Sequence, residues 1–275
     1  MQAIARQFRE VVLGAFEQFA GQDVPLCFSG GVDSCLALAA LMEVGARPHP
    51  FTFYLEPNMS NDSTSAQMIA KTLGLRFELI MLPRNPTVLE RDIRYVLSVI
   101  DRPTKVHVQV CQPFVYMCRR MVELGYDFAM MAMSIDDMWG KGREFQITRR
   151  KYGEKAFSDY RRKVMEDPDQ SDWSVVKMCA HEGIRMIDPF RTPALVEFML
   201  GLTHNDMHGR MDKGIAVYAF PEFWSRGAFY RGNGPSLQVD SGIREWHDTL
   251  LQSPLNIRNS KAVVAIYTDM WKGRV

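Results

Sequence analysis

The sequence lacks the features that mark secreted, membrane-spanning and zinc-binding proteins. Its five cysteines, at positions 27, 35, 111, 118 and 179, form no C-x-x-C pair, so we expect free thiols, mostly in the core. No stretch reaches the roughly 18 uninterrupted apolar residues of a membrane span. Residues 1–10 contain no apolar core of a signal peptide. We therefore expect a cytoplasmic protein with no membrane partner.

An excess of charge of one sign is also missing. Lys and Arg number 33 against 32 Asp and Glu, and the net charge of +1 gives no global argument for binding nucleic acid or a membrane. The six histidines show no H-E-x-x-H spacing, so no zinc site is expected. The 275 residues, 47% of them hydrophobic, suffice for one large α/β domain or a domain with a helical extension.

The most informative stretch is Ser29-Gly30-Gly31-Val32-Asp33-Ser34. An apolar run of strand length precedes it, and an apolar run with the length of a buried helix follows it. A strand, a glycine turn and a helix in this order aim free backbone N–H groups and the positive end of a helix dipole at an anion. The two serines add hydroxyl donors, and the aspartate could hold a divalent cation beside phosphate oxygens. The stretch therefore predicts a phosphate-binding loop.

Two common phosphate-binding motifs, G-x-x-x-x-G-K-[ST] and G-x-G-x-x-G, are absent. The order S-G-G-V-D-S after a strand instead resembles the pyrophosphate loop of the N-type ATP pyrophosphatases. That superfamily includes asparagine, GMP and NAD synthetases and several tRNA-modifying enzymes. The resemblance implies a Rossmann-like (HUP-type) fold, ATP as a cofactor, and pyrophosphate bound by residues 29–34. The alternative interpretation is a Gly-Gly turn that Ser34 caps at the start of a helix.

Strand-like and helix-like segments alternate along the first half of the chain. The expected strands are residues 24–28, 50–55, 75–82 and 126–133, and the expected helices are 2–20, 35–42, 62–73, 86–100 and 112–124. This alternation predicts an α/β fold with a parallel sheet and right-handed crossovers. We assign residues 1–140 to an ATP-binding core and residues 141–275 to a mostly helical region that completes the site on the acceptor side.

Ligands of such sheets lie beyond the carboxyl ends of the strands. Tyr54 and Leu55 end the second strand, where an adenine ring would stack, although either side chain could equally be core. Asp136 and Asp137 follow the fourth strand and could complete a magnesium site with Asp33 and phosphate oxygens. The alternative for this pair is two exposed residues of an acidic turn.

The acidic turn extends the resemblance. Residues 134–142, Ser-Ile-Asp-Asp-Met-Trp-Gly-Lys-Gly, resemble the G-x-G-x-D-E-x-x-G-G loop of asparagine synthetase and β-lactam synthetase, although Ser134 stands where the family has a glycine. Lys213, before an apolar helix, looks like the family's late lysine. The resemblance implies that this lysine is catalytic and faces the α-phosphate and the developing negative charge. Without the resemblance, Lys213 would read as an ordinary surface lysine.

The stretch ending Arg185-Met186-Ile187-Asp188-Pro189-Phe190 resembles the family's E-x-R-x-P-F-L-D segment. Arg185 stands where the family has a glutamate on the acceptor side of the site, which argues against aspartate as the acceptor. Glu182, one turn earlier, would replace that glutamate only if the local register shifted. We take Glu182 and Arg185 as the acceptor-side candidates.

The resemblance implies an AMP-forming carbon–nitrogen ligase that uses ATP and Mg²⁺. An acceptor carboxylate or carbonyl oxygen would attack the α-phosphate, pyrophosphate would leave, and ammonia or an amine would then displace AMP. The chain begins Met1-Gln2-Ala3 and has no room for a glutaminase domain. Nitrogen would therefore come from free ammonia, a separate glutaminase or an amine on a second substrate, and a homodimer stays open.

Two alternatives remain at this stage. Residues 141–163 carry nine Lys or Arg against three acidic residues, a composition that fits an anionic acceptor, including nucleic acid, or a solvated helix face. The first alternative is therefore a pyrophosphate-loop enzyme that adenylates a nucleobase of tRNA or DNA for thiolation or lysidine-type modification. The second is a non-catalytic protein that only senses ATP.

Overall fold

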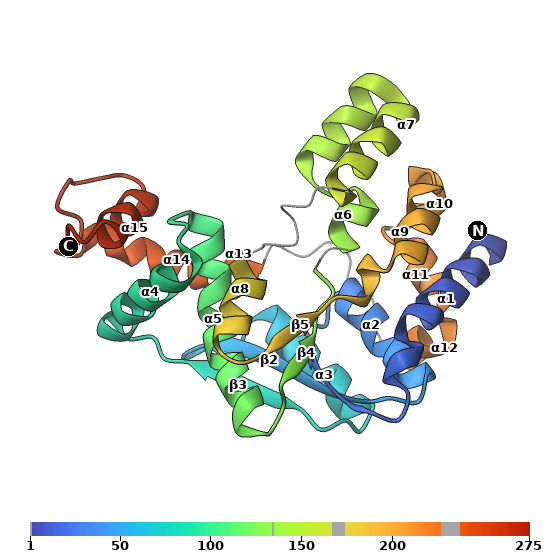
Figure 1. Ribbon diagram of the computed structural model, residues 1–275, viewed down its shortest axis with the longest axis horizontal. Helices are drawn as coiled ribbons and strands as arrows, with labels where there is room; N and C mark the ends of the chain where they lie inside the picture. The colour runs from blue at the N-terminus through green and yellow to red at the C-terminus, as the bar shows by residue number, and fades with distance from the viewer. Residues whose placement is uncertain (1, 134, 167–173, 227–236) are drawn as a thin grey trace.

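Five parallel strands form one sheet in the order β3-β2-β1-β4-β5, which confirms the expected α/β class (Figure 1). The computed structural model describes residues 2–133, 135–166, 174–226 and 237–275. The strands are β1 (Asp23–Cys27), β2 (Arg47–Leu55), β3 (Glu78–Leu82), β4 (Phe128–Met130) and β5 (Arg185–Ile187). The fifth strand was not expected from the sequence, and β3 and β4 are shorter than the apolar runs that predicted them.

The strand order reverses between β1 and β4. From β1 the chain adds β2 and β3 on one side, and it then adds β4 and β5 on the other. Leu26 of β1 pairs with Met130 of β4, while Cys27 pairs with Phe51 of β2. In open α/β sheets, the crevice beyond the carboxyl ends at such a reversal is the usual ligand site. The loop after β1 and the acidic turn after β4 both lie at this reversal.

The helices of the first half are α1 (Gln2–Phe16), α2 (Val32–Glu43), α3 (Asn61–Thr72), α4 (Pro86–Ile100) and α5 (Lys105–Glu123). Four of them agree with the expected ranges to within a few residues. Helix α5 begins at Lys105 rather than at residue 112 and contains Pro113. Residues 105–111 alternate polar and apolar side chains like a strand, but packing against α8 and the sheet makes them helical.

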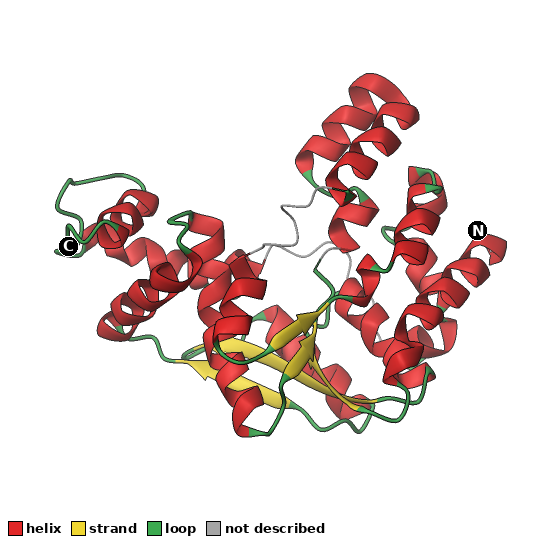
Figure 2. Cartoon of the chain, in the orientation of Figure 1, coloured by secondary structure: helices red, strands yellow, loops and turns green. Residues whose placement is uncertain are grey.

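The second half is mostly helical, as expected (Figure 2). Its helices are α6 (Ile135–Trp139), α7 (Arg143–Met165), α8 (Ser174–His181), α9 (Pro193–Leu200), α10 (His204–His208), α11 (Gly214–Ala219), α12 (Pro221–Ser225), α13 (Leu237–Asp240), α14 (Ile243–Asp248) and α15 (Val263–Trp271). Strand β5 pairs with β4, so the second half also completes the sheet. The division of the chain at residue 140 stays a prediction.

Helix α7 is a helical hairpin that stands away from the sheet (Figure 1). Its chain turns at Gly153, whose φ of 83° and ψ of −177° are not helical. Only glycine adopts this combination of angles without strain. The basic segment expected from the sequence therefore forms two short antiparallel helical arms above the sheet edge.

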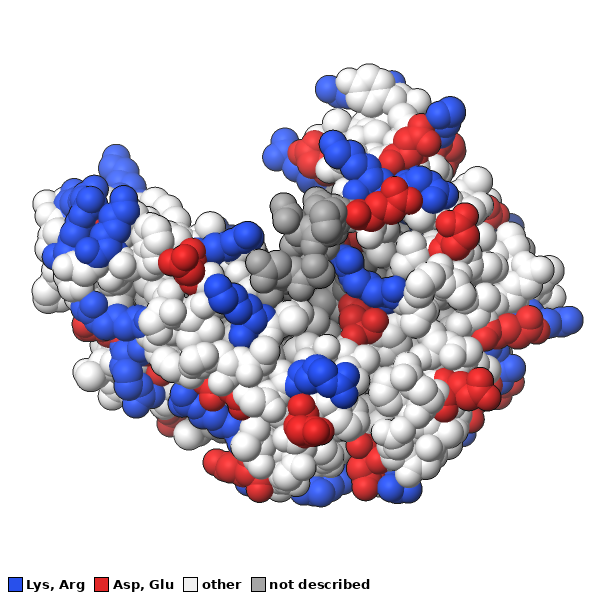
Figure 3. Space-filling model, viewed as in Figure 1, with Lys and Arg blue, Asp and Glu red and all other residues white. Residues whose placement is uncertain are grey.

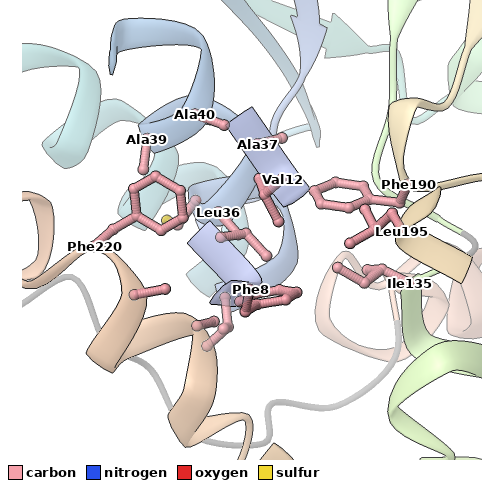
Figure 4. Close-up of a cluster of buried hydrophobic side chains, with 14 of the residues drawn as sticks. Phe8, Val12, Leu36, Ala37, Ala39, Ala40, Ile135, Phe190, Leu195 and Phe220 are labelled. Carbon is pink, nitrogen blue, oxygen red and sulfur yellow. The ribbon is translucent and has the colours of Figure 1, made fainter. Parts of the chain in front are cut away.

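Two apolar clusters hold the sheet between helical layers. One packs α2 against α1, α9 and α11, and includes Phe8, Leu36, Phe190 and Phe220 (Figure 4). The other packs β2 and β4 against α4, α5, α8, α14 and α15. Helix α2, which follows the phosphate loop, is buried along almost its whole length. The loop is therefore held by a helix that the core fixes on several sides.

The five cysteines are free, as expected, and all except Cys27 are fully buried. Cys35 directly follows the loop, yet its side chain lies in the apolar core. Within the described ranges, no helix has both the length and the apolar composition needed to cross a membrane.

Candidate functional site

The predicted phosphate loop connects β1 to α2. Gly31 occupies the N-cap of α2, and its N–H donates to Ser29 Oγ at 3.2 Å. Ser34 lies inside α2, where its hydroxyl donates to the Gly31 carbonyl at 3.1 Å instead of capping the first turn. The simple capped turn considered from the sequence is therefore not what forms. The first turn of α2 begins without a side-chain cap and faces the cavity described below.

Gly30 is required for both its backbone angle and its packing. Its φ is +72°, a region that side chains other than glycine enter at a cost. A Cβ there would lie 2.9 Å from the Ala66 backbone nitrogen and 3.0 Å from Ser65 Cβ. The loop therefore packs directly against α3, and no side chain fits between them.

Three residues from distant parts of the chain meet beside this loop. The Lys213 ammonium donates to Asp33 Oδ2 at 2.5 Å and to Asp136 Oδ1 at 2.7 Å. Asp33 and Lys213 are 180 positions apart in the sequence. Lys213 is only 7% exposed, so it is not the surface lysine that its sequence context alone suggested. The structure thus brings together the residues singled out in the loop, in the acidic turn and before the apolar helix.

Burial and mutual attraction set the protonation of this cluster. Burial raises the pKa of Asp33 to about 6, and the nearby Lys213 cation only partly opposes this rise. Burial alone would lower the pKa of Lys213, but Asp33 and Asp136 outweigh it and hold that pKa above its ordinary value. At neutral pH the cluster therefore contains the Lys213 cation beside an ionised Asp33.

The same two carboxylates fit a magnesium ion. The gap between Asp33 and Asp136 already accommodates a cation, the Lys213 ammonium. In the part of the chain that the structure describes, no group of three or more His, Cys, Asp or Glu could hold a metal. A magnesium ion here would need phosphate or water oxygens to complete its shell, which is its usual habit. Asp137 does not line the cavity, and Ser134 lies outside the described residues.

Two buried residues that sequence reasoning missed connect the cluster. The Trp139 indole N–H donates to Asp33 Oδ1 at 2.7 Å. His208 Nε2 lies 3.2 Å from the Trp139 carbonyl and therefore carries a proton, while the Lys213 N–H donates to His208 Nδ1 at 3.0 Å. Trp139 falls inside the stretch that resembles the family's acidic loop, which was the available signal. The sequence around His208 gave no such signal, because its contact with the Lys213 N–H exists only once the intervening turn has folded.

The cluster borders a cavity of about 1060 Å³. Figure 3 shows the surface hollowed between the α7 hairpin and the side of the molecule that carries α15. The apolar residues of its lining are Phe51, Phe53, Val106, Val110, Phe114, Met117, Met131 and Met133. Its polar lining includes Lys141, Gln146, His204, Arg210 and Asp212. Residues of the phosphate loop, Asp136 and Lys213 also line it.

Tyr54 and Leu55 do not line this cavity. Three earlier residues of the same strand, Phe51, Thr52 and Phe53, line it instead. Leu55 is in the apolar core and borders a separate cavity of about 240 Å³. The sequence therefore predicted the strand correctly, but it did not show which residues of that strand line the cavity.

Glu182 and Arg185 lie at the opposite end of the sheet. Arg185 is the first residue of β5, and its N–H donates to the Asp127 carbonyl at 2.9 Å. Glu182 accepts a hydrogen bond from Tyr95 Oη at 2.6 Å and another from Arg119 Nε at 3.0 Å. The structure therefore does not bring the two acceptor-side candidates to the loop, because β5 starts at the amino edge and runs toward the cavity.

The basic segment 141–163 divides into different environments. Arg161 is fully buried, where it donates to the carbonyls of Met138, Met199 and Leu202 and thereby ties α6 to α7 and α9. Burial lowers its pKa to about 10, so it stays charged. Lys155 and Arg162 form ion pairs with nearby carboxylates. Arg150 and Lys151, near the tip of the hairpin, are exposed.

Comparison with known proteins supports the resemblance for one half of the chain. Residues 7–138 match the family model described as asparagine synthase. This segment contains the phosphate loop and Asp136 and ends one residue before Trp139. Among curated protein sequences there is no significant match to this chain.

Three solved structures are also similar to the chain. The U34-tRNA thiolase NcsA of Methanococcus maripaludis, described with its [4Fe-4S] cluster, is 13% identical with a TM-score of 0.39, covering 98% of this chain and 79% of that one. A predicted subunit of tRNA methyltransferase from Methanocaldococcus jannaschii is 19% identical with a TM-score of 0.34, covering 65% and 74%. NMN synthetase of Francisella tularensis is 12% identical with a TM-score of 0.30, covering 94% and 97%. At these scores the three likenesses carry no functional argument.

Proposed function

We propose that this protein is an AMP-forming ligase that adenylates an acceptor, because residues 7–138 match the family model described as asparagine synthase. An acceptor carboxylate or carbonyl oxygen attacks the α-phosphate of ATP, the bond from that phosphorus to the bridging oxygen breaks, and pyrophosphate leaves. Ammonia or an amine then attacks the activated carbon, loses a proton, and AMP departs. The observation that carries the proposal is the meeting of Lys213 and Asp33 beside the loop, from positions 180 residues apart.

The cavity suggests how a nucleotide would lie. The β- and γ-phosphates are bound by residues 29–34, of which all except Gly30 line the cavity. The base and ribose lie against the apolar part of the lining, where Phe53, Val106 and Phe114 offer the aromatic and aliphatic surface that a flat base prefers. This placement replaces Tyr54 and Leu55 as the residues beside adenine.

Lys213 supplies the charge that the transfer needs. Its buried ammonium is a fixed cation at the place where the loop and the acidic turn meet, and negative charge grows on the α-phosphate oxygens as the acceptor attacks. Asp33 and Asp136 would hold Mg²⁺, which would neutralise charge on the departing pyrophosphate. Trp139 keeps the Asp33 carboxylate oriented toward the cation, and His208 holds the backbone of Lys213.

The second step of the proposed reaction needs a source of nitrogen. Free ammonia, a separate glutaminase and an amine-bearing second substrate would each satisfy the second step. The chemistry at Asp33 and Lys213 is the same in all three cases, because it ends with the departure of pyrophosphate.

A second candidate function is the adenylation of a tRNA or DNA base. The observation that favours it is the α7 hairpin, which stands beside the cavity and exposes Arg150, Lys151 and Tyr152, the last at 71%. Exposed arginine and lysine beside an aromatic ring suit a single-stranded nucleic acid. The same pyrophosphate release would then depend on a polynucleotide rather than on a small acid.

The test is pyrophosphate release from ATP and Mg²⁺ across a panel of aspartate, other amino and keto acids, deamido-NAD, bulk tRNA and DNA. Asp33→Asn should abolish the release. The matched control is Asp23→Asn, because Asp23 begins β1 at its other end and pairs only with Arg47 on the surface. Release that depends on one acceptor and on Asp33 supports the ligase. ATP binding without release on any acceptor favours the sensor, and absence of ATP binding contradicts the proposal.

A further inference from the structure

Among the described residues, Arg161 is a buried cation with which no carboxylate pairs. Its side chain is fully buried, and its guanidinium donates to three backbone carbonyls, those of Met138 at 2.9 Å, Leu202 at 3.0 Å and Met199 at 2.6 Å. Burying a charge without a carboxylate partner is costly, and an apolar side chain of similar volume is often no less stabilising. The planar fork of the guanidinium can, however, fix several carbonyls at once. The position of these carbonyls therefore determines what Arg161 can do.

We propose that Arg161 is a positioning residue, which holds α6 so that its side chains stay in place for the proposed reaction. This inference rests on the proposed ligase function. Met138 lies between Asp136 and Trp139, the two residues of α6 that belong to the cluster. Asp136 accepts from the Lys213 ammonium at 2.7 Å, and the Trp139 indole N–H donates to the aspartate of the phosphate loop at 2.7 Å. The hydrogen bond to the Met138 carbonyl therefore fixes the backbone from which both side chains reach the cluster.

Helix α6 is too short to hold this position by itself. It has five residues, and a helix of that length is not stable without contacts to the rest of the fold. The carbonyls of residues 138, 139 and 140 at its end each accept a hydrogen bond from the side chain of another helix, those of Arg161, His208 and Gln146 respectively. Such terminal carbonyls have no partner within their own helix. Arg161 is the donor that also reaches the end of α9.

The end of α9 is a firm attachment point. Met199 lies in the last turn of α9 and Leu202 just beyond it, and the Met199 side chain is fully buried in the apolar cluster around α1 and α2. Phe157 lies one turn before Arg161 on α7, and its ring centroid is 5.3 Å from the guanidinium carbon. A Cβ at Gly140 would lie only 2.5 Å from two carbons of this ring. The guanidinium thus connects α6 to a fixed helix, and the ring leaves α6 no space to move toward α7.

The experiment compares Arg161→Lys and Arg161→Met with the control His247→Asn. Lysine keeps the charge without the planar fork, and methionine avoids the cost of burying an ammonium. His247 is a buried hydrogen-bonding residue of α14 that does not line the cavity, so its replacement controls for a general loss of stability. The ¹⁵N-indole signal of Trp139, assigned with Trp139→Phe, reports its hydrogen bond to the phosphate loop. Pyrophosphate release and the affinity for AMPCPP, an ATP analogue that cannot release pyrophosphate, are measured on the same proteins.

Both Arg161 variants should shift the Trp139 signal and slow release by about 10–100-fold, because misplacing a catalytic group by about 1 Å can cost about 10²-fold. Their AMPCPP affinity should stay within about threefold of the wild type, since the loop is unchanged, and His247→Asn should alter neither the signal nor release. An unshifted signal, unchanged release, equal losses in His247→Asn, or unfolding of both Arg161 variants would each overturn the positioning role. Absence of release from the wild type would instead contradict the ligase proposal, and the Trp139 signal would then decide the positioning role alone.

Discussion

The two ends of the sheet each carry an ion pair between a carboxylate and a cation, but the two ion pairs lie in different surroundings. At the carboxyl end, Asp33 and Asp136 meet Lys213. At the amino end, Glu182 meets Arg119. Both are carboxylate–cation groups with a hydrogen-bonding aromatic residue, Trp139 in one case and Tyr95 in the other. Only the first group borders the large cavity.

The two groups differ in the surroundings of the cation, which are the cavity for Lys213 and bulk solvent for Arg119. Lys213 is 7% exposed, and the space beside it is the cavity. Arg119 is half exposed and borders bulk solvent, so its pairing is screened and worth little beyond local stability. A buried cation beside empty space is ready to meet a ligand's charge, whereas a cation facing water is not. Cavity access therefore separates a candidate site from a structural ion pair of similar composition.

Replacing Lys213 by Met should have the largest effect on activity. The proposed cation at the α-phosphate is removed while the length of the side chain is kept, and pyrophosphate release should fall about 10²–10³-fold. ATP affinity should change much less, because the backbone N–H groups of the loop are not altered, although Asp33 loses its partner. Steady-state release with the best acceptor measures this.

The control for that variant is Arg119→Met, which removes the cation of the amino-end group. It should keep release within twofold of the wild type. An equal loss in both variants would mean that the two ends of the sheet do not differ in the way proposed.

Gly30→Ala should be the most destabilising change in the loop. The new Cβ combines a positive φ with a backbone atom 2.9 Å away, and we expect a loss of about 3 kcal/mol in the free energy of unfolding, together with loss of ATP binding. Gly125→Ala provides the match, since Gly125 has a φ of +84° but nothing within 4 Å of the added Cβ. Its cost should be only about 1 kcal/mol. Urea unfolding of both variants measures the difference, and similar costs would contradict the close packing of loop and α3.

The sequence was sufficient for the fold class, the loop and the residues that repeat a family motif. Apolar runs predicted four of the strands, and β1 and β2 do bury continuous stretches. Asp33 and Asp136 followed from local patterns, whereas Lys213 was singled out only through the family resemblance. Strand β5 has only three residues, and its pairing with β4 depends on the sheet already being formed. A run that short carries too little periodicity to be recognised.

The sequence did not reveal which side chains reach the cavity, because that depends on how the folded chain orients each element. Tyr54 and Phe53 are adjacent in the sequence, yet the cavity borders Phe53 and not Tyr54, a difference that depends on where the cavity crosses the strand. Glu182 was chosen by likeness to a motif, but its position before β5 puts it at the wrong edge of the sheet for the loop. His208 ends α10 and Arg210 lies in the turn that follows, whose path no local pattern specifies.

A buried titratable residue away from the cavity should reveal itself in the pH dependence of stability. Burial lowers the pKa of His247 to about 3, and its ring lies 2.6 Å from Tyr267 Oη and 2.8 Å from Gln112 Oε1. The unfolded chain takes up this proton near pH 6.5, but the native state does not. The stability contributed by the neutral ring is therefore complete above pH 6.5 and is lost as the pH falls toward 3, by about 2 kcal/mol at pH 5.

Urea unfolding between pH 7 and pH 5 tests this dependence. His247→Asn should flatten the slope by that amount, although the variant is less stable at pH 7. The exposed His181 provides the control, because His181→Asn should leave the slope unchanged. The same slope in wild type and His247→Asn would show that this ring is not buried as a neutral group.

Glu182→Gln should have the smallest effect and bears most directly on the comparison of the two ends. The amide still accepts the Tyr95 hydrogen bond but no longer attracts the half-exposed Arg119, so unfolding should become easier by about 1 kcal/mol or less. Pyrophosphate release and the KM for the acceptor should stay within twofold of the wild type. A rise in the acceptor KM without a change in stability would instead return Glu182 to the acceptor side. It would also require the amino edge of the sheet to reach the cavity in a conformation other than this one.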